Sequence, residues 1–562
     1  MSAQSSILDP GSRILNPRSS LRLLVLVALT LCASLAHSDE AARAAIQALV
    51  TEGRSPARGT ALPAKEREAL TRFYESSAFQ PAWFSDSRPR PALSQAVDLL
   101  SAAGDDGLDP RDYDTEWLGA RLAASRSGGT DARLLATLDV ATTLAMLSWL
   151  RDLHSGRVDP RTIHPNLALP AQPFEAPAAL RDAIGGDAVR ELPDRHAPQL
   201  ALYRRLKDLH ARYRALASGP PLPSLPAIAK VEPGSVYQGM AALAARLVAF
   251  GDLASGTKPP VGDLYSADFV AAVKRFQSRH GLEPDGIVGK ATLAALAVSP
   301  AERATQIELA MERLRWLPAF APQPLVVVNV PAFRLWAFDL PDDSRPPTLA
   351  MKVIVGKALD TETPAFADTL RTIEFSPYWN VPKSIATKEI LPRLRRDPGY
   401  LAREDMELVR ADGTTAQAVT PESLAAIEGG TLRIRQRPGK HNAMGRIKFV
   451  LPNHLAIFLH DTSAPQLFTR SRRDFSHGCI RVEKPIELAL FALDGEKGWD
   501  AARVNEAMNR REPAYAGLPR PITVLVFYTT ALVDGEGRAF FYEDLYGHDR
   551  ALAKALDARH VR

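Results

Sequence analysis

A proline-rich stretch, ASGPPLPSLPAIAKVEPGS at residues 217–235, does most to limit what this chain can fold into. Proline fixes φ and removes a backbone donor, so a run of this composition ends helices and is typical of a linker. With 562 residues, the chain is also too long for one hydrophobic core, which predicts about two to four domains. We therefore expect a domain boundary within this stretch.

The part before the linker, residues 40–225, has the apolar spacing of helices. The segments ALTRFYESSAFQPAWF and LLATLDVATTLAMLSWLRDLHSGRVDP repeat apolar residues at helical intervals,. Between them, GDDGLDPRDYD at residues 104–114 has the composition of a turn,. We expect a packed helical scaffold domain here.

The first 38 residues are typical of a secretory signal peptide. Three arginines precede the apolar run LLVLVALTLCA at residues 23–33, and SLA ending at Ala36 offers a small-residue cleavage site. The run is shorter than the roughly 18 apolar residues of a membrane span. We therefore expect an exported protein, peripheral to the membrane at most. An uncleaved membrane anchor is the alternative.

The second region, residues 237–298, is expected to be a small helical module. Phe269, Val273 and Phe276 fall on one helical face, and Gly281 stands where a helix C-cap belongs,. The segment AVKRFQSRHGLEPDGIVGKATLAALA resembles the peptidoglycan-binding domain of wall enzymes. That resemblance implies contact with glycan strands or stem peptides.

The third region, residues 302–562, changes to β-rich patterning. The runs PLVVVNVPAFRLWAF and AMKVIVG alternate with turn signals, and a hairpin is expected around DGEG,. A charged helical insertion interrupts the strands at about residues 384–430. The insertion is either a lid over a site or a surface insertion with no role at a site. We expect an α+β multidomain protein with a mainly-β C-terminal domain.

The charge of the chain argues against one class of partner. The formal net charge is only +5, which suits an anionic polymer or a membrane surface better than nucleic acid. No glycine-rich phosphate loop occurs in the sequence. We expect no nucleic-acid partner and a monomer.

Cys479, in DFSHGCIRVEKP, is the cysteine that would remain after removal of the leader, because Cys32 lies inside the leader. An intramolecular disulfide is then excluded. The remaining interpretations are a buried inert thiol, an intermolecular disulfide, a metal ligand and a nucleophile. A zinc site needs three or four ligands, and neither a second cysteine nor HExxH is present in that part of the sequence. A nucleophilic thiol needs a base such as histidine, and His477 and His460 are the nearby candidates,.

The segment SHGCIRV, preceded by FLHDT, resembles the signature of the L,D-transpeptidases, the cysteine enzymes of the bacterial wall. RQRPGKHNAMGRIKFVLPN at residues 435–453 and SPYWNVPKSI at residues 376–385 extend the resemblance. The order of leader, helical scaffold, wall-binding module and catalytic domain is similar to that of the large periplasmic members. A periplasmic location is therefore implied.

The resemblance implies a role for each matching residue. Cys479 would be the nucleophile and His460 its base, oriented by Asp461 or by a nearby backbone carbonyl. His477 and Gly478 would shape the oxyanion site, with Ser476 bonding within the loop. Arg481 would hold the loop or meet a substrate carboxylate. The other candidates for the substrate cleft are Trp379, Asn380 and Phe458, the last standing where related enzymes often have tyrosine.

The implied reaction is acyl transfer through a cysteine thioester, with no metal or organic cofactor. The enzyme would release D-alanine from a tetrapeptide stem and form a 3→3 cross-link to a second stem. Carbapenems would acylate the same thiol. Two rival functions remain. With water as acceptor the same site would be an L,D-carboxypeptidase or endopeptidase, and without activity the chain would be a wall-binding scaffold.

Overall fold

The computed structural model describes residues 40–127, 131–170, 172–259, 261–358, 361–416 and 418–560. The expected signal peptide and Cys32 lie outside the described residues. The chain divides into two compact units. The first contains the chain up to residue 104 with residues 108–154 and 173–197, and the second contains residues 105–107, 155–172 and 198–562.

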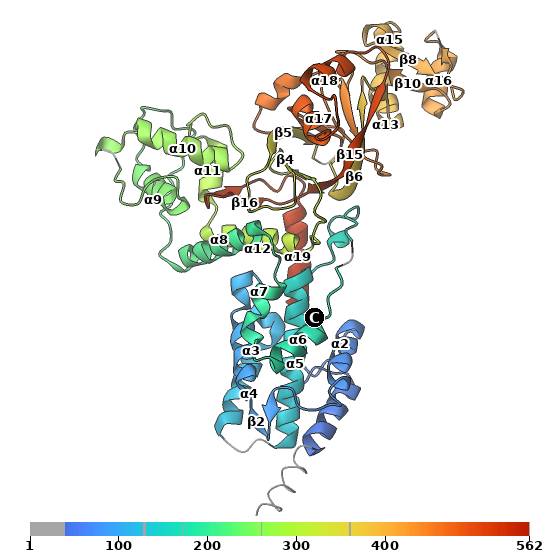
Figure 1. The fold of residues 1–562 in the computed structure, drawn as a ribbon. Helices are drawn as coiled ribbons and strands as arrows, with labels where there is room; N and C mark the ends of the chain where they lie inside the picture. Colours follow the sequence, from blue (N-terminus) through green and yellow to red (C-terminus); the bar gives the residue numbers. More distant parts are fainter. Residues whose placement is uncertain are drawn as a thin grey trace, which may run out of the picture. The chain divides into compact units, whose positions relative to one another are not determined.

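The first unit is helical, as the apolar spacing predicts (Figure 1). Its elements are α2 Ala64–Glu75, α3 Pro91–Ser101, α4 Thr115–Ser127, α5 Ala132–Ser155, α6 Ala176–Gly185 and α7 Leu192–His196, with a short hairpin of β1 Phe84–Ser85 and β2 Arg88–Pro89. Among the described residues, α5 is one helix whose length and composition would allow it to cross a membrane, and 72% of its most apolar window is buried. Burial of this kind is typical of the central helix of a folded core.

A buried polar network fixes α5 within the first unit. The Asp139 carboxylate accepts hydrogen bonds from Tyr74 Oη at 2.6 Å and from the backbone N–H of Trp83 at 2.8 Å. The Trp83 indole N–H donates to Thr143 Oγ1 at 2.9 Å. Burial raises the pKa of Asp139 to about 6, while these hydrogen bonds oppose that rise,. Every member is paired, so the network specifies one arrangement of the helices.

The second unit begins with helices and then forms the small three-helix module. Its helices before the β domain are α8 Ala201–Ser218, α9 Met240–Phe250, α10 Ala267–Arg279, α11 Lys290–Ala297 and α12 Pro300–Arg315. Phe269, Val273 and Phe276 are all buried, and Gly281 has φ +67°, as the sequence predicts. Arg279, buried at the end of α10, donates through Nε to Asp252 at 3.0 Å and through Nη1 to the carbonyl of Ala539. This arginine therefore joins the module to the β domain.

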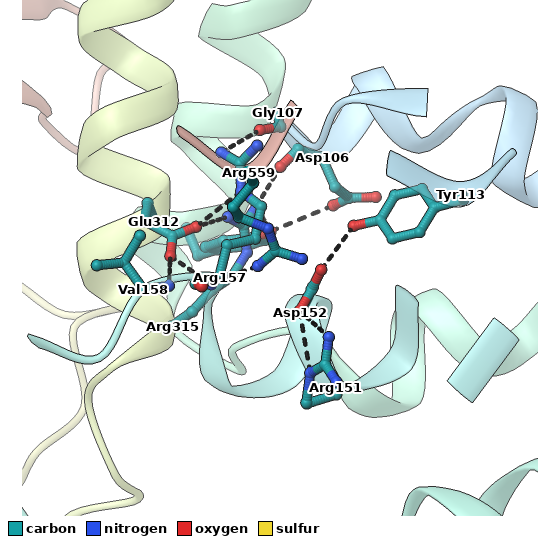
Figure 2. Close-up of polar contacts among 11 residues, drawn as sticks. Asp106, Gly107, Tyr113, Arg151, Asp152, Arg157, Val158, Glu312, Arg315 and Arg559 are labelled. Carbon is teal, nitrogen blue, oxygen red and sulfur yellow. Dashed lines mark hydrogen bonds and ion pairs between the residues drawn. The ribbon is translucent and has the colours of Figure 1, made fainter. Parts of the chain in front are cut away.

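A second buried charge cluster anchors α12, as Figure 2 shows. The fully buried Glu312 carboxylate accepts the backbone N–H of Val158 at 3.1 Å and pairs with Arg157 at 3.2 Å and Arg315 at 3.1 Å. Arg315 also donates to the carbonyl of Asp106. Burial acts to raise the pKa of Glu312, but the two arginines outweigh it and hold that pKa below its usual value,. In the first unit, the same figure shows Tyr113 donating to Asp152 at 3.2 Å.

The β domain is built on a nine-stranded sheet with the order β13-β5-β14-β12-β11-β6-β15-β3-β4. An additional β4–β5 pairing closes all strands except β13 into a ring, so the structure is a barrel. The strands are β3 Leu325–Asn329, β4 Arg334–Phe338, β5 Leu349–Gly356, β6 Phe366–Phe375, β11 Ile447–Val450, β12 Leu459–His460, β13 Asp474–Ser476, β14 Ile480–Val482 and β15 Ala514–Phe527. Two helices, α17 Pro485–Ala492 and α18 Ala501–Met508, contribute Leu488 and Val504 to its core.

The hairpin expected around DGEG is confirmed as β16 Ala531–Val533 and β17 Ala539–Phe541, paired antiparallel. It forms a two-stranded sheet of its own rather than an edge of the barrel. The last element of the chain is α19 His548–His560. The mainly-β character predicted for this domain is confirmed.

The insertion is a small lobe with its own core, drawn in orange in Figure 1. The helices expected in this insertion are present, and the lobe also holds a four-stranded sheet, in the order β7-β10-β8-β9, that the sequence did not predict. The elements are β7 Trp379–Asn380, α13 Lys383–Ile385, the π-helix η6 Ala386–Ile390, α14 Leu391–Arg396, α15 Tyr400–Arg403, β8 Met406–Val409, β9 Thr415–Ala416, α16 Pro421–Gly429 and β10 Arg433–Gln436. Short strands among charged residues show little alternation of apolar and polar residues, so the sequence does not predict them.

Candidate active site

Strand register brings the two principal candidates together. Strands β12 and β14 are parallel, with Leu459 opposite Ile480 and His460 opposite Arg481. Side chains alternate along a strand, so His460 and Arg481 lie on the same face of the sheet. Cys479 precedes Arg481 by two residues and shares that face. The histidine 19 residues upstream in the sequence is thus placed beside the cysteine by pairing of adjacent strands.

His460 is held by a backbone carbonyl rather than by a carboxylate. Its Nδ1 lies 2.5 Å from the carbonyl oxygen of Asp461, and the side chain is buried. A carbonyl can only accept, so Nδ1 carries the hydrogen and Nε2 keeps its lone pair for a proton. The Asp461 carboxylate instead accepts the backbone N–H of Arg446 at 2.9 Å. Of the two orienting groups expected, the carbonyl makes the contact.

The position of Asp461 depends on Gly445. Gly445 has φ +64°, and a Cβ built on it would lie 2.5 Å from Cβ of Asp461. A side chain at residue 445 would therefore displace the residue that orients His460. The segment GRIKFV carries part of the family resemblance, but the reason for its glycine appears only in the packing.

The environment of His460 keeps its imidazole neutral. Burial lowers the pKa of His460 to about 3, and the positive charge of Arg481 contributes in the same direction,. The Asp461 carbonyl opposes this shift. The resting ring is therefore an acceptor at Nε2 at neutral pH.

The thiol of Cys479 also rests in its neutral form. Burial raises the pKa of Cys479, although the backbone N–H of Phe458 and the charges of Lys448 and Arg481 act in the opposite direction,. Sγ lies 3.6 Å from the carbonyl oxygen of Ala456, to which the S–H donates. The site thus begins as a thiol and a neutral imidazole rather than as an ion pair.

A strained turn supplies that carbonyl. Ala456 has φ +55°, in the left-handed region that non-glycine residues rarely adopt,. Asn453 holds the turn: its Oδ1 accepts the N–H of Leu455 at 3.1 Å and of Ile457 at 3.2 Å, and its Nδ2 donates to the Ile457 carbonyl at 2.9 Å. The apolar run HLAIFLH at residues 454–460 is strand-like in sequence, but in the structure only Leu459–His460 form a strand. Sequence reasoning missed Asn453 and Ala456, and the pair PN before the apolar run was the available turn signal.

The backbone of the catalytic loop, defined here as residues 476–479, is braced on several sides. Ser476 Oγ donates to the Cys479 carbonyl at 2.5 Å and accepts the Gly478 N–H at 3.2 Å. Thr363 Oγ1 donates to the Gly478 carbonyl at 2.7 Å. Gly478 has φ +110°, which a residue with a side chain would adopt only under strain,. Ser476 therefore bonds within the loop, as expected, and the Gly478 N–H is directed to Ser476.

The side chain of His477 is held from the insertion. Its Nε2 lies 2.6 Å from Oε1 of Glu389, which belongs to η6. Sequence reasoning singled out His477 but not Glu389, since 88 residues separate the two positions. This contact fixes the insertion against the catalytic loop.

Arg481 has no described ion pair. Its Nε is buried without a hydrogen-bond partner among the described residues, and burial lowers its pKa. Its electrostatic partners are the thiol of Cys479 and the imidazole of His460, both of which rest in their neutral forms. A guanidinium without a described ion pair leaves a positive charge beside the Cys479 thiol.

The three cleft candidates separate in the structure. Phe458 lies at the site: its carbonyl accepts the N–H of Ile480 at 2.9 Å, and Lys448 Nζ is 4.1 Å from the centre of its ring. Trp379 instead packs against the core of the insertion, and Asn380 is exposed on the adjacent position of β7. The roles of Trp379 and Asn380 in binding substrate stay predictions.

Comparison with known families assigns three domains of the chain. Residues 323–501 match the "L,D-transpeptidase catalytic domain", residues 237–296 match the "Putative peptidoglycan binding domain", and residues 68–209 match the "Scaffold domain". The chain therefore contains an L,D-transpeptidase catalytic domain, a peptidoglycan-binding domain and a scaffold domain.

The sequence is also similar to a named bacterial protein. It is 31% identical over 244 residues to a Haemophilus influenzae protein named "Putative L,D-transpeptidase". The match covers 43% of this chain and 47% of that relative, so the chain aligns with about half of the relative's length.

Proposed function

We propose that this protein is a periplasmic peptidoglycan L,D-transpeptidase that forms 3→3 cross-links through a thioester on Cys479. The observation that carries the proposal is the orientation of His460. Its Nδ1–H is donated to the Asp461 carbonyl at 2.5 Å, and its strand places the ring on the same face as Cys479. Together with the catalytic-domain match, this arrangement supports nucleophilic catalysis by the thiol,.

In the first half-reaction, His460 Nε2 accepts the Cys479 proton as Sγ attacks the carbonyl carbon between the diamino acid and the terminal D-alanine. The C–N bond then breaks, and the imidazolium returns the proton to the leaving amine of D-alanine. The product is a thioester. The unpaired Arg481 supports an anionic substrate at this point, since stem peptides carry carboxylates,.

In the second half-reaction, the side-chain amine of another stem attacks the thioester carbon. His460 takes a proton from that amine and delivers it to the departing Sγ, which restores the thiol. The peptidoglycan-binding domain, joined through Arg279 to the β16–β17 hairpin, supports a polymeric wall substrate. Ping-pong kinetics are expected, and carbapenems are expected to acylate Cys479.

The test is incubation of the chain without residues 1–38 with disaccharide-tetrapeptide, followed by mass spectrometry. We expect a cross-linked dimer that has lost one D-alanine, and none with Cys479→Ala or His460→Gln. His454→Gln is the matched control, because His454 is exposed. Tripeptide monomer without dimer would identify a hydrolase that uses the same site. If the disaccharide-tetrapeptide is unchanged, a non-catalytic wall-binding scaffold becomes the preferred function.

A further inference from the structure

The insertion and the catalytic loop meet through one pair of side chains. Among the described residues, the contact between His477 and Glu389 is the hydrogen bond that joins residues 383–430 to the loop. The other described ion pairs of that segment, such as Arg395 with Glu428 and Arg403 with Asp397, are internal to it or reach β10 of the same lobe and the residue after β10. The described polar contact between the insertion and the catalytic loop is therefore made at His477.

The barrel holds the backbone of the catalytic loop, whereas the insertion holds the His477 side chain. Ser476, Thr361 and Thr363 hold the main chain through hydrogen bonds to residues 476–479. The His477 imidazole has none of these partners, and Glu389 is its described hydrogen-bond partner. The orientation of the ring is thus decided by the insertion, while the orientation of the backbone is decided by the barrel.

The local structure around Glu389 is unusual. Residues 386–390 form a π-helix between two short α-helical segments, and Ile390 and Leu391 bury themselves in the core of the insertion. A π turn adds a residue to the helical repeat and rotates the following side chains, and such turns are frequent at functional sites. Glu389 lies in this turn, next to residues that pack into the apolar core of the lobe. Its carboxylate is therefore carried by a well-packed element.

We propose that Glu389 is a positioning residue of the active site, supplied by the insertion, which orients the His477 ring beside Cys479 and holds the lobe against the catalytic loop. This inference rests on the proposed function for its catalytic consequence. An ionised Glu389 accepts the Nε2–H of His477, which fixes the tautomer and turns Nδ1 away from the lobe. The His477 ring is then already oriented when substrate binds. Loss of the Glu389–His477 contact would release both the ring and the lobe.

The first experiment measures transpeptidation by Glu389→Ala, Glu389→Gln and the control Glu428→Ala. Glu428 is a carboxylate of the same insertion, but its partner is Arg395 inside the lobe. Because the pair is partly exposed, we expect Glu389→Ala to lower kcat/KM by about three- to tenfold, with Glu428→Ala unchanged. Glu389→Gln retains an acceptor oxygen and is expected to recover most of the loss. Equal effects of Glu389→Ala and Glu428→Ala would overturn the proposal.

A double-mutant cycle with His477→Ala separates positioning from a general loss of stability. If Glu389 acts through His477, Glu389→Ala should cost nothing further in the His477→Ala background. Additive losses would overturn the coupling. A thermal unfolding curve for each variant would show whether the lobe itself has unfolded.

A readout independent of transpeptidation keeps this inference distinguishable from the proposed function. Iodoacetamide alkylates Cys479 in the full chain, and peptide mapping separates it from Cys32. We expect Glu389→Ala to change the alkylation rate of Cys479 by about threefold or more, and Glu428→Ala to leave it unchanged. If the wild type formed no cross-link yet this difference persisted, the proposed function would fail while the coupling stood. If the alkylation rates of all variants agreed, the coupling would fail.

Discussion

His460 stands opposite Arg481 across the parallel strands β12 and β14. This register places a buried imidazole, a guanidinium without a described ion pair and the Cys479 thiol on one face of the barrel. The imidazole is oriented by the Asp461 carbonyl, and the thiol donates to the Ala456 carbonyl. Each of these relationships can be tested by a change at a neighbouring residue.

Gly445→Ala should lower the transpeptidation rate by about 10- to 100-fold, because small displacements at a catalytic group are costly. The added Cβ would fall 2.5 Å from Cβ of Asp461, whose carbonyl orients His460. Gly517→Ala is the matched control, since a Cβ there meets nothing within 4 Å. A steady-state assay on both variants decides the matter, and equal rates would disprove the packing argument.

Thr363→Val keeps the shape of the side chain but removes its hydroxyl. Thr363 Oγ1 accepts the Gly356 N–H at 2.8 Å and donates to the Gly478 carbonyl at 2.7 Å, and the residue is buried. Leaving these groups unpaired should lower the free energy of unfolding by about 1–3 kcal/mol. Chemical denaturation followed by tryptophan fluorescence measures the change. Thr348→Val, at an exposed hydroxyl bonded to Asp339, should have little effect.

The reactivity of Cys479 should rise with pH without a plateau near neutrality. Burial holds the pKa of the thiol above its ordinary value, so the thiolate fraction at pH 7 is small,. Between pH 7 and 9 the alkylation rate should increase about tenfold per pH unit, in proportion to thiolate. Peptide mapping after timed iodoacetamide treatment gives the rate, with a small free thiol as reference. A plateau at neutral pH would instead reveal a thiolate–imidazolium pair.

Acid should destabilise the second unit through its buried histidines. The pKa values of His460 and His164 are lowered to about 3, chiefly by burial, against 6.5 in the unfolded chain. Between pH 6.5 and 3 the unfolded state binds more protons, so stability falls as pH falls. Each histidine contributes about 1.4 kcal/mol per pH unit in that range. Proton uptake on unfolding at pH 5, measured by calorimetry in buffers of different ionisation enthalpy, tests this; absence of uptake would contradict it.

Glu312→Gln should destabilise the second unit more than any exposed carboxylate does. The change removes the negative charge that Arg157 and Arg315 share in the interior. Breaking a buried pair of this kind costs about 3–5 kcal/mol. Glu536→Gln, whose partner Arg538 is exposed, should have little effect on stability,. Denaturation midpoints of the two variants give the comparison, and similar midpoints would show that Glu312 is not an anchor.

The predictable parts of the fold were those with strong local signals. Long apolar periodicity marked the scaffold helices and α10, and β-branched runs marked β3 and β5. The short strands β7 to β10 were not predicted, because two to four residues are too few to show the alternation of a strand,. The strained turn at Ala456 was not predicted, because it depends on hydrogen bonds made by the Asn453 side chain.

The sequence by itself determined which residue types the candidate site contains. An unpaired Cys479, a histidine at the end of an apolar run and a glycine before the thiol define residue types and an order that local spacing can reveal. The tertiary structure decided the rest. Parallel pairing of β12 with β14 set His460 opposite Arg481, two residues beyond Cys479. A backbone carbonyl rather than the Asp461 carboxylate became the partner of His460, and Glu389 reached His477 across 88 residues. These contacts are non-local, and their partners become known only when the barrel closes and the insertion packs, because nothing in local spacing encodes which distant atoms will meet.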